Sequence, residues 1–479
     1  MEARAYRTSI KYGPAAFVAI LLLVLAIWRF GPVTPTQAAA LAIAILFLLG
    51  LKRPVWVMAA ILVSSLTLNN SLVHLSSSLV ISVRLLLVML AWVIVLMTSG
   101  LKGIQIGPKT RRILVPALIL VVLSIIANSV NPGGIGNTSK DFRQWAAAIL
   151  IALLLPAVVR NLKDLKILCG VVLVCLSASA AIAIMQHYNF LGMNQHTLTG
   201  FDVVGSFRAP GIAEAPLELS YVLASVLPIA AGIYLFKGVK GGTRSFMMAS
   251  FVLMLLGTYF TYTRSALMGV AVGFVALAML VRSRDRLKIL LVLFLVGFVF
   301  LLFSQAHDTR LVSTTDTSAE GRVVLRDAGI DIARDHPLFG IGAYNFETVS
   351  LQYASRINPV AFQQAGGYET LGQYPPHNDF VFLAACYGIP ALIVFIWLLA
   401  IVLLSIRDTY RATGRPFIKG LSCGLIGALL AYLTNAYYHN CLFDIPLFWV
   451  LVGFSLAVAK LTLHDRKILG NSNGIRPST

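Results

Sequence analysis

The sequence predicts an all-α membrane protein: a polytopic transmembrane helical bundle of about 12–14 helices with one long outer loop that contains a short helix. Charged residues make up only 12% of the chain, whereas a soluble chain carries about 25%. Apolar residues make up 58% and the mean hydropathy is +0.84. They also form long runs such as Val115–Ala127 and Ile289–Phe303, as helices that cross hydrocarbon require. These features exclude a soluble enzyme, a fibrous protein and a disordered chain.

Hydropathy along the chain places the predicted helices. The second, third and ninth segments are short for a bilayer, so paired or re-entrant segments would reduce the number to about twelve. The first segment follows three cations and has no A-x-A cleavage site, so we expect a retained helix. The segments are 14–30, 36–50, 54–68, 79–98, 113–128, 144–160, 165–186, 212–236, 245–261, 264–281, 287–304, 377–405, 417–436 and 445–463.

Lys and Arg concentrate in alternate connections between these segments. With a cytoplasmic N-terminus, 27 of the 38 Lys and Arg fall on the cytoplasmic side, together with only five acidic residues. This is the positive-inside pattern, and it predicts a multi-pass membrane protein with both termini in the cytoplasm. The same pattern accounts for the net charge of +19, because cytoplasmic Lys and Arg set the topology and face anionic lipid of the inner leaflet. We therefore expect no nucleic-acid partner.

One connection, Gln305–Pro376, is far longer than the others and falls on the outer side. Loops of this length are usually functional. Its central part predicts a helix, because Leu325, Ala328, Gly329 and Ile332 repeat with helical spacing and a proline follows. The sequence thus predicts three regions: N-terminal membrane helices at 1–304, a long outer loop at 305–376, and C-terminal membrane helices with a cytoplasmic tail at 377–479.

The predicted outer helix carries two arginines on one face. Arg322 and Arg326 are four residues apart, and no acidic residue lies three or four positions from either. They repel each other unless an anion lies between them. A solvated basic face is the alternative interpretation. Asp331 and Arg334, in contrast, have the spacing of an ordinary ion pair.

The next apolar segment begins with the residues YPPHNDF, which place His377 at or just before the first turn of a helix. The positive end of a helix disfavours imidazolium, so we expect a neutral ring that can accept a proton. Asn378 and Asp379 could fix its tautomer or cap the helix. The alternative is an interfacial histidine with a structural hydrogen bond.

Further arginines occur at predicted outer helix ends. Arg264 lies at the outer end of the predicted helix 264–281. Because an arginine that faces hydrocarbon is costly, an arginine in this position usually faces a partner, a cavity or a ligand. Arg208 lies just before another predicted helix. Its position is equally consistent with a binding site and with a local ion pair to Glu214 or Glu218. Arg84 lies near enough to an outer end to snorkel.

Three outer helix starts, several arginines and a neutral base together predict a site for a polyanion. Guanidinium groups can neutralise phosphate without a metal. No metal site is predicted, and the cysteines have neither CxxC nor Cys/His spacing. The sequence also contains no outer DxD carboxylate cluster, P-loop or GxSxG elbow.

Several of these residues form a pattern that resembles the bacterial O-antigen ligase and O-antigen polymerase family. The pattern comprises Gly321-Arg322, the segment Pro337–Gly342 (PLFGIG), His377-Asn378 and the upstream Thr263–Ser265, and it covers about residues 257–400. The resemblance implies a metal-independent, GT-C-like membrane glycosyltransferase that needs no cofactor. It also implies a glycan on undecaprenyl pyrophosphate as the donor, and a location in the bacterial inner membrane with the active site facing the periplasm.

The resemblance further implies roles for single residues. Arg264 and Arg322 would bind the leaving diphosphate, and His377 would deprotonate an acceptor sugar hydroxyl that attacks the anomeric carbon, with inversion. Arg326, Arg208 and Asn378 are weaker candidates for binding the diphosphate. The acceptor is lipid A core in a ligase, a lipid-linked repeat in a polymerase, or a protein. The rival interpretation is a secondary transporter or flippase of lipid-linked oligosaccharide, which should show polar groups at the membrane midplane.

Overall fold

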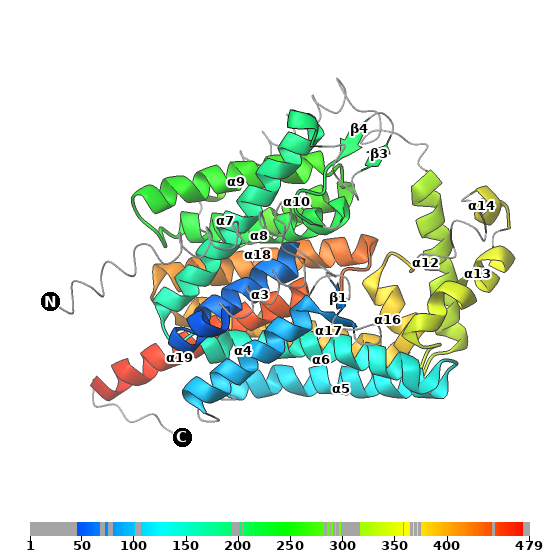
Figure 1. The fold of residues 1–479 in the computed structure, drawn as a ribbon, viewed down its shortest axis with the longest axis horizontal. Coiled ribbons are helices and arrows are strands. Elements are labelled where there is room, and N and C mark those ends of the chain that lie inside the picture. The colour runs from blue at the N-terminus through cyan, green and yellow to red at the C-terminus, as the bar shows by residue number, and fades with distance from the viewer. Residues whose placement is uncertain are drawn as a thin grey trace.

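The computed structural model is a bundle of long helices, with the helices α12, α13, α14 and α16 gathered at one end (Figure 1). The structure describes a defined part of the chain. It comprises residues 46–67, 72–74, 80–100, 107–193, 201–203, 206–213, 215–281, 317–357, 359–364, 375–442 and 446–472, with isolated positions at 285–297, 367 and 371.

Helices dominate the described residues, and the strands form only two short antiparallel hairpins. The helices are α3 Val55–Thr67, α4 Val83–Ser99, α5 Pro108–Val130, α6 Gly134–Val158, α7 Leu162–His187, α8 Pro216–Leu235, α9 Gly242–Phe260, α10 Arg264–Leu280, α12 Thr317–Asp335, α13 Phe346–Ile357, α14 Pro359–Gln364, α16 Asp379–Tyr387, α17 Ile389–Ala412, α18 Pro416–Tyr438 and α19 Leu447–Ser472. The short elements are β1 Leu72–His74, β2 Val80–Ser82, η2 Phe190–Gly192, β3 Phe201–Val203, β4 Ser206–Arg208 and η3 Ala343–Asn345.

The helical membrane architecture predicted from the sequence is confirmed. Eight helices among the described residues are long and apolar enough to cross a membrane: α5, α6, α7, α8, α9, α17, α18 and most of α19. Three shorter apolar helices, within α3, α4 and α10, accompany them. The predicted segment 14–30 and most of 36–50 and 287–304 lie outside the described residues, so the total of 12–14 stays a prediction.

Helix α18 lies in the centre of the described bundle, packed against α8 and α10 through glycines. A Cβ atom on Gly424 would lie 2.7 Å from the backbone oxygen of Pro228 in α8. A Cβ atom on Gly273 in α10 would lie 2.8 Å from the backbone oxygen of Gly427. Small residues allow helix backbones to approach this closely in membranes. These contacts fix the ends of α8, α10 and α18 relative to one another.

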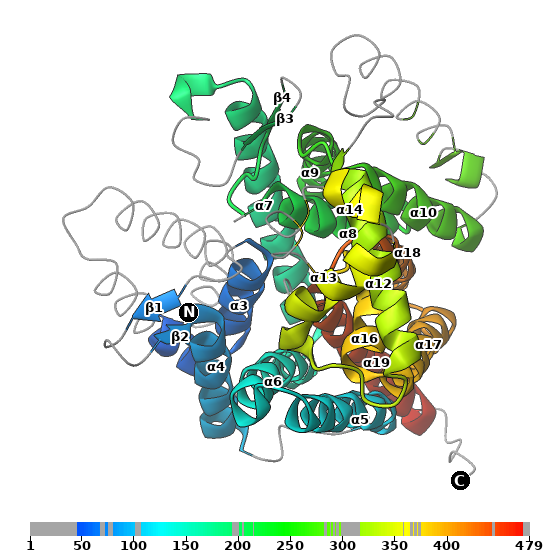
Figure 2. The same ribbon diagram turned by 90° about the vertical axis from the view of Figure 1, so that its right-hand side faces the viewer.

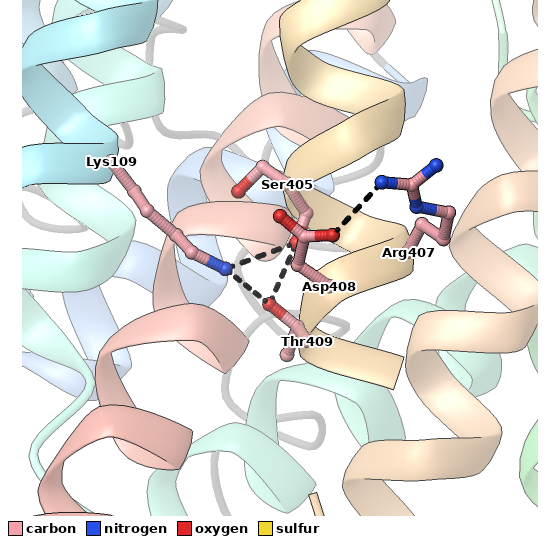
Figure 3. Close-up of polar contacts among 5 residues, drawn as sticks. All are labelled: Lys109, Ser405, Arg407, Asp408 and Thr409. Atoms are coloured by element: carbon pink, nitrogen blue, oxygen red, sulfur yellow. Dashed lines mark hydrogen bonds and ion pairs between the residues drawn. The ribbon is translucent and has the colours of Figure 1, made fainter. Parts of the chain in front are cut away.

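Cations connect the helices at one end of the bundle, where each donates to a neighbouring helix. Figure 3 shows Lys109, at the start of α5, donating from Nζ to the backbone oxygen of Ser405 and to Oγ1 of Thr409 in α17 (3.3 and 3.2 Å). Lys460 of α19 donates to the backbone oxygen of Pro156 near the end of α6 (2.6 Å). A cation near the last carbonyl groups of a helix interacts favourably with the helix dipole.

The same end carries further polar connections. Arg415, at the start of α18, pairs with Asp465 of α19 (2.6 Å), and Tyr410 Oη donates to the backbone oxygen of Leu280 at the end of α10 (2.7 Å). We call this the basic end. Because α18 starts there and α10 ends there, the start of α10 and the end of α18 lie at the opposite end of the bundle.

Among the described residues, the segment after residue 316 covers that opposite end with the helices α12, α13 and α14. Helix α12 is the one that the sequence predicted, and α13 and α14 are additional. Helices α12, α13 and α14 lie across the end of the bundle (Figure 2). They enclose a small apolar core of their own, separate from the main core. Its buried members are Val324, Leu325, Ala328, Ala354, Phe362 and Leu371. Helix α12 therefore rests on a packed support, which fixes the face that its arginines present.

Candidate functional site

A cavity of about 300 Å³ lies at the end of the bundle opposite the basic end. This volume is at the lower limit of the range typical of small-molecule sites. Its wall includes the start of α8, the start of α10, one face of α12, the residues before α16 and the end of α18. The lining residues are Arg208, Leu217, Tyr262, Thr263, Arg264, Ser265, Met268, Arg322, Val323, Arg326, Pro376, His377, Tyr437, Tyr438 and His439.

Arg264 reaches the cavity because it is the first residue of α10. The turn before it is held by Arg208, which ends strand β4 and is buried. Arg208 donates from Nε to the backbone oxygen of Thr261 (2.9 Å) and from Nη2 to Oγ1 of Thr263 (3.1 Å). Arg208 thus lies in the cavity wall and also positions the N-terminus of α10.

The other residues considered for this region have different surroundings. Tyr262 is buried in the cavity wall and has a φ of 49°. Glu214, a candidate ion-pair partner, lies outside the described residues. Arg84 is the second residue of α4, which does not contribute to the cavity wall.

Arg322 and Arg326 both line the cavity from α12, as their four-residue spacing predicted. Arg326 also pairs with Asp327, its neighbour in sequence (3.0 Å). This pair was not predicted, because helical spacing pairs residues three or four positions apart and Asp327 is adjacent to Arg326 in sequence. Both partners are over a third exposed, so the pair stabilises the fold little. The expected pair of Asp331 with Arg334 is present at 2.6 Å.

His377 lies just before α16, as expected, and lines the cavity. Its φ of 51° is uncommon for a residue with a side chain. Burial, together with the positive charge of Arg322, lowers the pKa of His377 to about 4. A neutral ring was predicted from the helix dipole, whereas desolvation is the larger cause of the lowered pKa. The ring is neutral near pH 7 and can accept a proton.

Asn378 and Asp379 lie behind the cavity wall. Asn378 caps α16, because its Oδ1 accepts from the backbone N–H groups of Phe380 and Val381 (2.9 and 3.0 Å). Its Nδ2 donates to the backbone oxygen of Tyr437 (2.9 Å). Asp379 is fully buried and accepts from Cys441 N (3.1 Å). Asn378 is thus not among the lining residues. Together, Asn378 and Asp379 connect the start of α16 to the end of α18 and to the segment that follows it.

The cavity wall also includes Tyr437, Tyr438 and His439, which were not predicted from the sequence as site residues. His439 is buried, and its ring lies edge-on to that of His377 with a centroid distance of 6.0 Å. A signal was present in the sequence: His439-Asn440 repeats the dipeptide His377-Asn378, at another predicted outer connection.

The PLFGIG segment follows α12 and docks against the end of α16. Ile341 N and Gly342 N donate to the backbone oxygens of Ala385 and Cys386 in α16 (3.0 and 2.9 Å). Gly340 has a φ of 60°, and a Cβ atom there would collide with the backbone of Ala385 and Cys386. The glycine permits this close approach. The segment thereby sets the distance between the helix that carries Arg322 and the helix that follows His377.

The segment that carries Arg264, Arg322 and His377 is similar to a known protein family. Residues 249–396 match the O-antigen ligase family model. The resemblance to the O-antigen ligase family is thereby confirmed. The match includes Arg264, Arg322 and His377 and indicates glycan transfer of the O-antigen ligase or polymerase type in a membrane. It ends before Tyr437. No curated protein matches the chain.

Proposed function

We propose that this chain transfers a glycan from undecaprenyl pyrophosphate to an acceptor sugar hydroxyl at the periplasmic face of the bacterial inner membrane. The basic end would face the cytoplasm, following the positive-inside rule. The observation that carries the proposal is the cavity in which Arg264, Arg322 and a neutral His377 meet.

The proposed reaction follows from the chemistry of these groups. The acceptor oxygen attacks the anomeric carbon while the bond from that carbon to the diphosphate oxygen breaks. His377 takes the hydroxyl proton, and the leaving diphosphate keeps the electron pair. Arg264 and Arg322 stabilise its developing negative charge, which is greatest in the transition state. Attack on the face opposite the leaving group inverts the anomeric centre.

The arginines supply the charge that a metal ion supplies in other transferases. A guanidinium group binds phosphate oxygens through two parallel hydrogen bonds and does not lose its proton at physiological pH. The start of α10 adds the partial positive charge of a helix N-terminus on the same side of the cavity. We therefore propose a metal-independent transfer, with Arg326 and Arg208 as secondary contributors of positive charge.

The direct test is transfer by His377→Ala in membranes supplied with the lipid-linked donor. A general base contributes about 10²–10⁴ in rate, so we expect a loss of this size with normal insertion. The matched control is His336→Gln, since His336 is an exposed histidine of the same outer segment. Near-normal transfer by His377→Ala would rule out this base.

A second variant tests the cationic side of the cavity. Arg322→Lys keeps the positive charge but lacks the planar fork, so we expect weaker donor binding and slower transfer. Arg334→Lys is the control, because Arg334 lies on the same helix and does not line the cavity. Unchanged donor affinity and rate in Arg322→Lys would remove Arg322 from the site.

Deletion of the gene distinguishes the acceptor classes. Single repeats on the lipid anchor would indicate a polymerase, and full-length chains missing from lipid A would indicate a ligase. A surface glycan that is normal in the deletion strain, with an unmodified glycoprotein, would indicate a protein acceptor. Accumulation of donor in the cytoplasmic leaflet alone would contradict glycan transfer and favour a flippase.

A further inference from the structure

The part of the cavity wall at the end of α18 differs in chemistry from the part that carries the arginines, which we call the arginine wall. Tyr437, Tyr438 and His439 carry no formal positive charge, whereas β4, α10 and α12 contribute four arginines. The C-terminal end of a helix also carries about half a negative charge. A diphosphate is therefore repelled from this wall, while sugar hydroxyls can donate to groups there.

The two tyrosines present aromatic surface to the cavity. Tyr437 is 50% exposed and Tyr438 is 38% exposed, and their rings pack edge to face with a centroid distance of 5.1 Å. The negative face of an aromatic ring attracts polarised C–H groups, such as those on one face of a pyranose ring. Two perpendicular rings in a cavity wall thus fit a saccharide better than an acyl chain.

His439 adds unused hydrogen-bonding capacity. Its ring is 3% exposed and packs on Tyr221, and its Nδ1 finds no hydrogen-bond partner among the described residues. An unsatisfied buried polar atom costs about 1–3 kcal/mol, so its retention calls for an explanation such as a ligand. Burial and the charges of Arg322, His377 and Arg208 hold the pKa of His439 well below its usual range. A neutral ring can bind a hydroxyl without adding charge.

The segment is held rigidly beside the proposed base. Asn378 donates to Tyr437, and Asp379 accepts from Cys441 N and, at 3.5 Å, from Asn440 Nδ2. The wall therefore moves with the start of α16. Because a base must lie next to the hydroxyl that it deprotonates, a sugar bound here is the acceptor.

We propose that Tyr437, Tyr438 and His439 form the subsite for the acceptor sugar, outside the segment that matches the ligase family. This proposal rests on the proposed function, since it assumes that His377 deprotonates the acceptor. It places acceptor selection in the wall at the end of α18 and donor binding in the arginine wall.

Steady-state kinetics of the purified full-length chain test the proposal, with lipid-linked donor and the host's lipid-free surface glycan as acceptor. We expect Tyr438→Ala to raise the apparent KM for the acceptor about tenfold and to leave the donor KM within about twofold. Tyr438→Phe keeps the ring and should restore the acceptor KM. The matched control is Tyr344→Ala, since Tyr344 is also 38% exposed but does not line the cavity.

His439 is tested by the way in which KM and kcat respond. We expect His439→Ala to raise the acceptor KM with little change in kcat, and His439→Gln to recover part of the affinity. A loss in kcat alone would instead assign His439 to the reacting atoms and overturn its place in the subsite. An unchanged acceptor KM in Tyr438→Ala, or a rise in the donor KM instead, would overturn the subsite as a whole.

Binding measurements separate this proposal from the proposed function. Inorganic pyrophosphate serves as the probe for the arginine wall and the lipid-free glycan as the probe for the tyrosine wall. If the wild type binds the glycan through Tyr438 but transfers nothing, the proposed function is wrong and the saccharide subsite stands. If the wild type transfers glycan and Tyr438→Ala behaves like it, the subsite is wrong and the proposed function stands.

Discussion

The pH dependence of transfer follows directly from the surroundings of His377. Burial and Arg322 lower its pKa to about 4, and a base acts only in its neutral form. The rate should therefore stay constant as the pH falls from 7.5 and decline only as the pH passes through the pKa of the folded protein. A solvent-exposed histidine would lose its neutral form near pH 6.5 instead.

The size of the effect can be worked out for pH 5. With a pKa of about 4, about nine-tenths of the His377 rings are neutral at that pH. With an ordinary pKa of about 6.5, only about 3% would be neutral. We therefore expect transfer at pH 5 to remain close to its value at pH 7.5, whereas an unshifted base would give a roughly thirtyfold loss.

The assay is initial-rate transfer at saturating donor, measured from pH 4 to 8 for the wild type and for His336→Gln. Selective ¹³C labelling of histidine gives the pKa directly, when the spectrum of His377→Gln is subtracted from that of the wild type. A rate that halves near pH 6.5, matched by a His377 resonance that titrates there, would refute the reasoning about burial.

Three further predictions concern the supports of the site. Gly340→Ala should destabilise the purified protein and slow transfer. Gly241 has a φ of 57° and a ψ of −143° with nothing within 4 Å of a Cβ atom, so Gly241→Ala should cost only the backbone strain, about 1–3 kcal/mol; equal melting temperatures of the two variants would contradict the close docking of Gly340. Asn161→Ala removes a helix cap with two hydrogen bonds and should lose about 1 kcal/mol of stability. Asn378→Ala removes a cap of the same kind and also the hydrogen bond to Tyr437, so it should lose more stability, and it alone should slow transfer; equal transfer by the two variants would separate the cap from the site. Arg322→Gln removes a positive charge that lowers the pKa of His377, so the pKa should rise and the acidic limb of the pH profile should move to higher pH. An acidic limb at an unchanged pH would show that the charge of Arg322 does not affect His377.

Much of the architecture was predictable because it depends on local composition. Apolar runs must form helices in hydrocarbon, since no water is there to satisfy the backbone, and alternate basic connections must lie at one end. Lys109 and Lys460 do lie together at the basic end. His377 at a helix start and the shared face of Arg322 and Arg326 also follow from spacing within a few residues.

Other features depend on contacts between distant parts of the chain, and the sequence alone could not give them. The role of Arg208 as a support for the turn before α10 depends on a contact with Thr261, 53 residues away. Asn378 was a candidate ligand from its position, but its hydrogen bond to Tyr437 spans 59 residues. Helices α13 and α14 were missed because their short, mixed sequences are stabilised by packing on α12.

The sequence by itself determined that the chain is a helical membrane protein, which alternate connections are basic, and which arginines and histidine to consider. Each of these depends on the solubility or charge of short segments. Only the tertiary structure decided that Arg264, Arg322 and His377 share one cavity with Tyr437, Tyr438 and His439. That assembly depends on glycine contacts between α8, α10 and α18 and on the docking of Gly340 against α16, and the surface complementarity behind such contacts is not encoded in any local pattern.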